Sequence, residues 1–466
     1  MTENHDEYGA RPKGARTVPI VSAIWENGTI VETVYRPQES RTALVIWKND
    51  AWHYQVEPVE LSPGRIAVPY SPYNNLLRNN VVLLPSEPEE YGSEASLLAE
   101  IQAFIHRYVD VSPLFEKIAS YYVLLSWIYD GFNELPYLRL RGDPGSGKTR
   151  FLLIVGSLCY KPMFASGAST VSPLFRILDT FRGTLIIDEA DFRLSDERAE
   201  IVKILNNGNA RGFPVLRSEA TPTREFNPRA YAVFGPKLVA TRRPFEDRAL
   251  ESRCITEEMG QYKLREDVPI NLPAAHKDEA LHLRNKLLLF RFRNLHKRKP
   301  NENLVDRSIE PRLNQIFVPL LSIVDDGEAR AELRALARRY DREMVTERGM
   351  DMEAQILEII REMVALPDQH LSIKEIASWF SDRHGTDYQR PVTPKWIGSV
   401  IRTRLQLRTR KSDGVFIIPR EEMPKLVRLY EKYGLAREGA EEGNGGSTTA
   451  PSPAAVDGLQ GVQGLL

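Results

Sequence analysis

The sequence predicts an α/β fold, in which helices cover a parallel β-sheet and smaller domains flank it. Residues 136 to about 260 alternate short β-rich runs with helical segments, the order that produces parallel strands joined by crossover helices. A glycine cluster directly follows the first β-rich run, and two carboxylates close the third. The chain has 466 residues, too many for one ordinary hydrophobic core, so we expect several domains.

The composition is typical of a globular protein, with 42% hydrophobic and 27% charged residues. The net charge of −1 gives no overall attraction to nucleic acid, so such contacts would have to come from local patches. The apolar stretch YYVLLSWIY, which begins at Tyr121, is far shorter than the roughly 20 residues that span a bilayer. The amino terminus has no apolar leader. We therefore expect a cytoplasmic protein with no transmembrane helix and no membrane partner.

The two cysteines, Cys159 and Cys254, belong to no CxxC pair and have no histidine nearby in the sequence. Both lie in apolar surroundings, where cysteine commonly serves as a buried hydrophobic residue. We expect neither a disulfide nor a metal site from them.

Changes in residue pattern divide the chain into segments. Residues 1–17 are polar and are expected to form a flexible tail. Residues 18–90 contain β-rich runs such as TIVETVY and ALVIW between turn residues, which predict a small β-rich domain. From Glu94 the apolar spacing becomes helical, so residues 91–270 combine a helical lead-in with the parallel-sheet core. The remaining segments are a helical one at 271–350, a compact unit at 351–435 and a Gly-, Ser- and Pro-rich flexible tail at 436–466.

A complete phosphate-binding loop follows the first β-rich run of the core. It matches G-x-x-x-x-G-K-[ST] between a strand and a helix, and its residues are Gly142, Asp143, Pro144, Gly145, Ser146, Gly147, Lys148 and Thr149. Glycines at this spacing let backbone N–H groups surround phosphate oxygens at the start of a helix, where the helix dipole also favours negative charge. We expect Lys148 to reach the β- and γ-phosphates of ATP and the Thr149 hydroxyl to hold Mg²⁺.

Two carboxylates close the third β-rich run of the core, TLIIDE, at Asp188 and Glu189. Taken alone, this run is a common strand end with solvated acids. Its place about 40 residues after the phosphate loop predicts instead that Asp188 lies beside Mg²⁺ and that Glu189 polarises an attacking water. The pair therefore favours hydrolysis of ATP over storage of the nucleotide.

Six ordered motifs carry a resemblance to AAA+ ATPases over residues 136–325: GDPGSGKT, TLIIDEAD, LNNGNARGFPVLRSE, VFGPKLVATRR, FEDRALESRC and EPRLNQIFVPLLSI. The chain resembles the helicase-like ATPases of phages and mobile elements, and more distantly the superfamily 3 and minichromosome-maintenance helicases. This resemblance implies a P-loop AAA+ core, a helical lid at 271–350, and a DNA motor that assembles as a ring, most often a hexamer.

The same resemblance implies roles for single residues near the ends of the core. Thr241, at the end of KLVAT, matches the polar sensor of the γ-phosphate or the attacking water; the alternative is an ordinary strand-end threonine. Arg253 is the first choice for an arginine finger supplied to a neighbouring subunit, and Arg248 is the second. Arg312 of EPRL resembles a second sensor of the nucleotide. Each arginine could instead be a surface residue.

Two segments of the core region are candidates for contact with DNA. A hairpin with a polar turn at about 219–225 is predicted between the carboxylates and the sensor strand, and the resemblance places Arg217 or Arg224 in a pore; both could be solvated charges. Residues 281–300 contain seven cations and no carboxylate, which would attract phosphate. The alternative for this segment is an amphipathic lid helix, and both descriptions could hold together.

The segment 351–435 predicts three helices followed by a two-stranded wing around residues 412–414. It resembles a winged helix-turn-helix, in which the third helix enters a major groove and the wing touches the DNA backbone. Residues 385–420 hold eight basic and two acidic side chains, a local charge of +6. Lys395, Arg402 and Arg404 are the candidates for DNA contact, although this fold also serves as a protein-binding module.

Taken together, these features predict an ATP-hydrolysing, ring-forming DNA helicase or translocase of a phage or mobile-element replication system. Its expected partners are DNA, further copies of the chain, and replication proteins. One alternative is an ATP-switched DNA-binding initiator or regulator that does not unwind DNA. Another is a remodelling ATPase that acts on protein. The β-rich domain at 18–90 carries no signature of primer synthesis.

Overall fold

The computed structural model forms two compact units, which divide between Asp341 and Arg342, inside helix α10 (Gly327–Gly349). Of the residues expected as an amino-terminal tail, 16 and 17 belong to the first strand. The rest of that tail and the tail at 436–466 lie outside the described part of the chain. The described residues are 16–55, 59–62, 64–167, 169–190, 196–220, 226–261, 263–349, 352–366, 371–384, 392–412 and 414–435.

The amino-terminal part of the first unit is β-rich. Its strands are β1 (Arg16–Ile20), β2 (Ser22–Ile24), β3 (Ile30–Arg36), β4 (Arg41–Lys48), β5 (Ala51–Tyr54), β6 (Val59–Ser62) and β7 (Arg65–Pro69), and a short helix, α1 (Asn75–Arg78), follows. Strands β2 to β5 form an antiparallel sheet in chain order, while β7 pairs with β1 in parallel and with β6 in antiparallel. Val31, Leu44 and Ala67 form a small buried core that the two sheets share.

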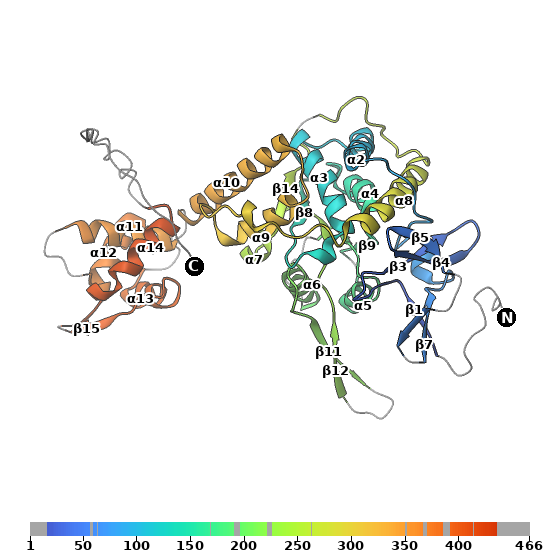
Figure 1. Ribbon diagram of the computed structural model, residues 1–466. Coiled ribbons are helices and arrows are strands. Elements are labelled where there is room, and N and C mark those ends of the chain that lie inside the picture. Colours follow the sequence, from blue (N-terminus) through green and yellow to red (C-terminus); the bar gives the residue numbers. More distant parts are fainter. Residues whose placement is uncertain are drawn as a thin grey trace, which may run out of the picture. The chain divides into compact units, whose positions relative to one another are not determined.

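A five-stranded parallel sheet forms the centre of the first unit, which confirms the predicted α/β core (Figure 1). Its strands are β8 (Tyr137–Arg141), β9 (Met163–Ser166), β10 (Leu185–Asp188), β13 (Lys237–Thr241) and β14 (Cys254–Glu258). They lie in the order β14-β8-β13-β10-β9, and every neighbouring pair is parallel. All residues of β13 are buried, because the sheet is covered on both faces.

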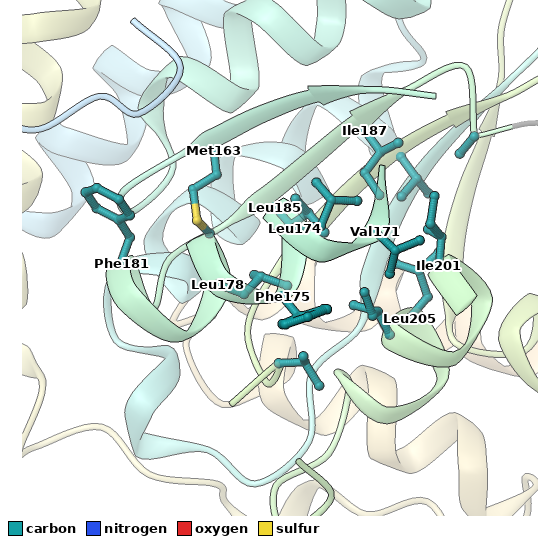
Figure 2. Packing of buried hydrophobic residues seen from close by; sticks show 14 of the residues in the cluster. Met163, Val171, Leu174, Phe175, Leu178, Phe181, Leu185, Ile187, Ile201 and Leu205 are labelled. Carbon is teal, nitrogen blue, oxygen red and sulfur yellow. The ribbon is translucent and has the colours of Figure 1, made fainter. Parts of the chain in front are cut away.

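Successive side chains of the sheet point to different helix layers. Leu185 and Ile187 of β10 pack with apolar side chains of α5 and α6 (Figure 2). Ile186, between them, lies against Gly156 of α4, where a Cβ would overlap its side chain. The layer with α4 contains α2 (Glu94–Tyr108), α3 (Pro113–Trp127), α4 (Lys148–Leu158) and α8 (His276–Asn294), and the other contains α5 (Val171–Phe181), α6 (Asp196–Asn207) and α7 (Arg248–Glu251).

The segment expected as a helical lid contains α8, α9 (Pro311–Leu321) and α10. Helix α8 packs against α2, α3 and α4, and α9 packs against α3. As far as Asp341, these helices belong to the same compact unit as the parallel sheet. Their assignment as a lid stays a prediction.

A buried charge network joins the amino-terminal strands to the helices of the core. Glu32 of β3 accepts hydrogen bonds from the Tyr160 hydroxyl at 2.5 Å and from Arg291 Nε at 2.8 Å. Lys161 Nζ lies 3.0 Å from the other Glu32 oxygen, and Arg291 also pairs with Asp130 at 2.6 Å. The side chains of Glu32, Lys161 and Arg291 are at most 2% exposed. Since an unpaired charge is costly at such depth, the network fixes how β3 packs on α8.

Both cysteines are buried free thiols, and burial raises the pKa of each to about 12. They therefore stay protonated and poorly nucleophilic at neutral pH. Among the described residues, no group of three or more His, Cys, Asp and Glu side chains could hold a metal ion by itself. Within the same residues, no helix has the length and apolar character needed to cross a membrane.

The second unit combines helices with a short antiparallel hairpin. Its main elements are α11 (Met352–Ala365), α12 (Ile373–His384), α13 (Pro394–Thr403), β15 (Arg410–Ser412), β16 (Val415–Ile417) and α14 (Met423–Lys432). Apolar side chains of the helices, among them Ile360, Phe380 and Ile401, form its core. The order of three helices and a hairpin is the one predicted from the sequence, and the assignment as a winged helix stays a prediction.

We expect Arg291→Met to lower the free energy of unfolding by about 3–5 kcal/mol, because Glu32 and Asp130 would lose a buried cation. Urea unfolding followed by tryptophan fluorescence measures the change. The matched control is Arg293→Met in the same helix. Arg293 pairs with Glu90, but these side chains are 34% and 61% exposed, so the loss should stay below about 1 kcal/mol. Equal losses from both substitutions would contradict the role of the network.

Candidate functional site

Three strands of the parallel sheet end at one edge, and each is followed or closed by a residue predicted to act on ATP. Strand β8 leads into the phosphate loop at Gly142, β10 ends at Asp188, and β13 ends at Thr241. Because the carboxyl ends of parallel strands meet at the same edge, these parts come together there. Strand β13 lies between β8 and β10, so Thr241 is placed between the loop and the carboxylates.

The phosphate loop connects β8 to α4 through backbone conformations that favour glycine. Gly145 and Gly147 have φ values of 81° and 94°, in the left-handed region. A Cβ at Gly142 would come within 2.6 Å of the Met259 backbone oxygen. Gly147 directly precedes Lys148, the first residue of α4, so the amino end of the helix opens into the loop. This arrangement fits the binding of an anion such as phosphate.

Lys148 folds back over the loop to which it belongs. Its Nζ donates to the backbone oxygens of Gly142 at 2.7 Å and Asp143 at 2.6 Å, and to Ser146 Oγ at 3.2 Å. None of these three oxygens carries a full charge, so a phosphate would be a stronger acceptor for the same ammonium group. The position of Lys148 therefore fits its predicted contact with the β- and γ-phosphates.

Thr149 and Asp188, both predicted from the sequence as Mg²⁺ ligands, are in direct contact across the edge of the sheet. Thr149 Oγ1 donates to Asp188 Oδ2 at 2.6 Å. The other carboxylate oxygen accepts from the backbone N–H of Glu189 at 2.9 Å, which orients the group. A hydroxyl and a carboxylate are the oxygen ligands that Mg²⁺ takes from phosphate-loop proteins. The chemistry of the pair thus fits Mg²⁺.

Glu189 occupies a strained backbone position just after β10. Its φ is +54°, in the left-handed region that a non-glycine residue rarely adopts. Gly167, after β9, leaves the room for it, because a Cβ there would overlap the Glu189 carbonyl oxygen. The Glu189 side chain is 69% exposed. A carboxylate held in the open beside the phosphate loop can accept a proton from a water molecule.

Arg242 belongs to this site, although the sequence analysis did not identify it. It directly follows Thr241, and its guanidinium lies 3.3 Å from Glu189 Oε1. Its only signal in the sequence is its place after the sensor strand, which becomes informative once β13 is known to lie beside β10. Thr241 itself is 1% exposed, and its hydroxyl makes no hydrogen bond to any described residue. An unpaired buried hydroxyl at this place fits a sensor.

Arg253 and Arg312 lie at the opposite edge of the sheet, where the amino ends of the strands β8 and β14 meet. Arg253 directly precedes β14, and its carbonyl oxygen accepts from the N–H of Tyr137, the first residue of β8. The five residues of β8, about 13 Å of strand, separate this edge from the phosphate loop. Arg312 donates to Ser252 at 3.1 Å, beside Arg253. Neither arginine therefore lies beside the phosphate loop of its own chain.

Arg253 is held at the end of α6. Its guanidinium donates to Asn209 Oδ1 at 2.7 Å, to Asn206 Oδ1 at 2.5 Å and to a backbone oxygen of α7 at 2.6 Å. Burial and the nearby charge of Arg312 lower the pKa of Arg253. Because two cations lie close together here, an anion would relieve their repulsion. Arg248, the second choice for the finger, is exposed at the first position of α7.

The predicted hairpin is present as β11 (Val215–Ala220) and β12 (Phe226–Tyr231), an antiparallel pair that extends away from the sheet (Figure 1). Arg217 of β11 pairs with Glu200 of α6 at 2.5 Å. This ion pair connects the hairpin to α6. Contact of Arg217 with DNA would compete with this pair. Arg224 lies outside the described residues.

Lys237, the first residue of β13, ties the base of the hairpin to the sheet. Its buried Nζ donates to the backbone oxygens of Gly208, Val233 and Gly235 at 3.0–3.1 Å. Burial lowers the pKa of Lys237 to about 7. One side chain therefore connects the end of α6, the exit of the hairpin and the sensor strand.

The cationic stretch at 281–300 is not the phosphate-attracting surface that its composition indicated. Arg284 and Arg291 are buried and cannot meet a nucleic acid. Three further cations pair with carboxylates from distant segments: Lys286 with Glu100, Arg293 with Glu90, and Arg298 with Glu94 and Asp325. For these five of the seven cations the prediction is wrong, because burial or carboxylates from other segments engage them only after folding, whereas Lys297 and Lys299 stay exposed. Of the alternative, the inward packing of leucine and phenylalanine side chains is confirmed for α8, and its assignment to a lid stays a prediction.

The three candidate DNA contacts of the second unit differ in their surroundings. Arg404, just after α13, pairs with Glu353 of α11 at 3.0 Å. Arg402 of α13 is exposed and contacts Thr409 Oγ1 at 3.5 Å. Lys395, in the first turn of α13, is exposed and has no carboxylate partner among the described residues. Lys395 and Arg402 are thus open to a ligand, whereas Arg404 is engaged within its own unit.

No protein-family model matches this chain, and no curated protein matches it by sequence. Solved structures that match it include the apo NrS-1 C-terminal region, with 12% identity, a TM-score of 0.35 and coverage of 83% of this chain and 95% of that one. SCCmec type IV Cch, described as an active helicase, is 12% identical, with a TM-score of 0.38 and coverage of 88% and 80%. A full-length MCM homologue from Methanopyrus kandleri is 11% identical, with a TM-score of 0.33 and coverage of 68% and 78%. At such identities and TM-scores, these likenesses carry no argument about function.

We expect Lys148→Ala to abolish ATP binding, because the substitution removes the cation placed over the phosphate loop. Titration with a fluorescent ATP analogue measures the affinity. Lys277→Ala, which removes an exposed lysine at the start of α8, is the matched control and should leave the affinity unchanged. Normal binding by Lys148→Ala would rule out this loop as the nucleotide site.

Glu189→Gln should keep ATP binding and lower turnover by about 100-fold or more, because the amide cannot take a proton from water. Release of inorganic phosphate, measured at saturating ATP and Mg²⁺, gives the turnover rate. The binding titration on the same variant separates the two effects. Ordinary turnover by Glu189→Gln would show that another group activates the water.

Proposed function

We propose that this protein is an ATP-hydrolysing DNA helicase or translocase that works as a ring of identical subunits. The observation that carries the proposal is the division of the ATP machinery between two edges of one sheet. Lys148, Thr149, Asp188 and Glu189 lie at one edge, whereas Arg253 lies at the other. A chain with this arrangement completes its site with a second copy, and such head-to-tail contacts form a ring when the rotation between copies closes.

Within one chain, the described residues supply the parts needed to cleave the terminal phosphate of ATP. Lys148 and the N–H groups at the start of α4 bind the phosphates, and Thr149 with Asp188 holds Mg²⁺. Bound Mg²⁺ neutralises charge on the β- and γ-phosphates. Glu189 takes the proton of the attacking water, and the Thr241 hydroxyl contacts that water or the γ-phosphate. Arg242, as a partner of Glu189, sets how readily this carboxylate turns to the water.

Between chains, Arg253 and Arg312 supply positive charge to the phosphoryl group that a neighbour is cleaving, with Arg248 as the alternative finger. Arg253 is held by Asn206 and Asn209, which lie at the end of α6 just before the hairpin. Movement of Arg253 toward a neighbour's phosphate would therefore pull on the base of β11 and β12. This connection gives a route from hydrolysis to movement of the hairpins.

The hairpin and the second unit are the proposed DNA-binding parts. Arg217, if it leaves Glu200, and Arg224, in the turn that the sequence predicts, would meet the DNA backbone in the pore. The second unit would bind as a winged helix, with α13 in a major groove and Lys395 and Arg402 on phosphates. The resemblance to phage and mobile-element ATPases extends the proposal to replication of such an element, together with other replication proteins.

The native chain should displace one strand of a forked DNA duplex when ATP and Mg²⁺ are present, because hydrolysis drives the hairpins along the DNA. A fluorescence-quenching assay follows the displacement. Lys148→Ala should give none. Binding and DNA-stimulated hydrolysis without displacement would favour the ATP-switched initiator instead. ATP hydrolysis that DNA does not stimulate would point to a protein-remodelling ATPase.

Arg253→Ala should lower ATP turnover by about 1000-fold or more, since a finger acting in trans contributes on that order. Mixtures of Arg253→Ala with Lys148→Ala should regain part of the activity, because an intact loop from the first variant can then meet an intact arginine from the second. Phosphate release, measured across mixing ratios, tests this. Activity that never rises above the sum of the two variants would exclude action in trans.

A further inference from the structure

The hairpin of the second unit presents an aromatic side chain to solvent. Phe416 of β16 is 51% exposed, and its neighbour Val415 is 37% exposed. Neither residue belongs to the apolar core of this unit, which includes Ile418 just beyond the strand. Phe416 pairs across the hairpin with Lys411 of β15. The Phe416 ring, beside the Lys411 cation, therefore does not contribute to the apolar core of its unit.

The segment that leads from α13 into this hairpin is strongly cationic. Residues 392–412 contain six lysines and arginines and no carboxylate. Two of these cations are engaged, Arg404 with Glu353 at 3.0 Å and Arg410 with Glu421 at 3.9 Å. The other four have no carboxylate partner among the described residues: Lys395, Arg402, Arg408 and Lys411. Unlike Arg291 and Arg293 of α8, these four cations have no counter-charge within the part of the chain that the structure describes.

The outer face of α13 and the hairpin are connected. Lys395, Ser399 and Arg402 are exposed and recur at the spacing of one helix face. Arg402 reaches Thr409, directly before β15, at 3.5 Å. The cationic face of the helix therefore leads to the strand that carries Lys411, opposite Phe416. Figure 1 shows this hairpin at the lower edge of the unit.

From this surface we infer that the second unit recognises a junction between duplex and single-stranded DNA, with Phe416 stacked on the first unpaired base. The four cations would neutralise backbone phosphates, and a major groove is wide enough to admit a helix such as α13. The apolar ring of Phe416 has no favourable interaction with charged phosphates. Inside a duplex both faces of every base are already stacked, so a base face is open only at a duplex end or where the strands separate, and only the second place also offers an unpaired base. This inference rests on the proposed DNA-binding function and adds the DNA structure that is recognised.

The test compares dissociation constants of the full-length chain, without nucleotide, for a fork, a blunt duplex and a single strand of matched length. The native chain should prefer the fork. Phe416→Ala should weaken fork binding by about 5- to 100-fold, the range measured for loss of one base–aromatic stack, and should leave blunt-duplex binding unchanged. Phe416→Trp should restore the preference. Val427→Ala removes an apolar side chain of α14 that is also 51% exposed. It should leave the dissociation constants for all three DNA substrates unchanged.

A second readout reports on stacking directly. With 2-aminopurine at the first unpaired position of the fork, the native chain should quench its fluorescence and Phe416→Ala should not. A fork affinity that is unchanged in Phe416→Ala, or reduced equally on the blunt duplex, would overturn the inference and leave the hairpin as a protein-docking or structural element. DNA binding by the native chain without any fork preference would overturn it while the proposed function stands. Failure to bind any DNA would instead refute the proposed function.

Discussion

Strand β13 pairs in parallel with β8 on one side and β10 on the other, and the candidate site depends on this pairing. The register places Thr241 beside Arg141, the last residue before the phosphate loop. A slip of one residue would turn every side chain of β13 to the opposite helix layer and would remove the Lys237 ammonium group from the three backbone oxygens that hold it. Tyr122 of α3 adds a further restraint, since its hydroxyl contacts both the N–H and the carbonyl oxygen of Lys237 at 2.8 and 3.1 Å.

The same parallel arrangement places Arg253 far from the phosphate loop of its own chain. All carboxyl ends of the strands lie at one edge, so all amino ends lie at the other, and the residue before β14 is necessarily remote from the phosphate loop. Arg253 occupies that place. A catalytic cation at the remote edge serves the chain only if copies assemble head to tail, which is the physical basis of the proposed ring. In the proposed ring, the attachment of Arg253 to Asn206 and Asn209 would couple the interface between copies to the hairpin.

Positive charge has different structural roles in two cationic segments, helix α8 and residues 392–412. In α8, Arg291 meets Glu32 and Asp130 in the interior, so its charge stabilises the joining of the amino-terminal strands to the core. In the segment 392–412, most cations stay exposed without carboxylate partners among the described residues. The difference lies in the neighbours: α8 packs against other helices and contacts β3, whereas Lys395 and Arg402 of α13 are exposed among the described residues of their own unit. Only the second segment retains the field that attracts phosphate.

The sequence by itself determined the parallel-sheet core, the phosphate loop, the carboxylates after β10 and the hairpin of β11 and β12. Each depends on residues close together in the chain: glycine spacing, apolar runs, and the polar residue that ends a strand. The tertiary structure decided which distant residues meet. Arg242 reaches Glu189 only because β13 lies beside β10, and Arg291 meets Glu32 across 259 positions of sequence. Such partners follow from strand order and helix packing, which no local pattern encodes. Local patterns could therefore predict the chemical role of a residue but not its contacts with distant residues.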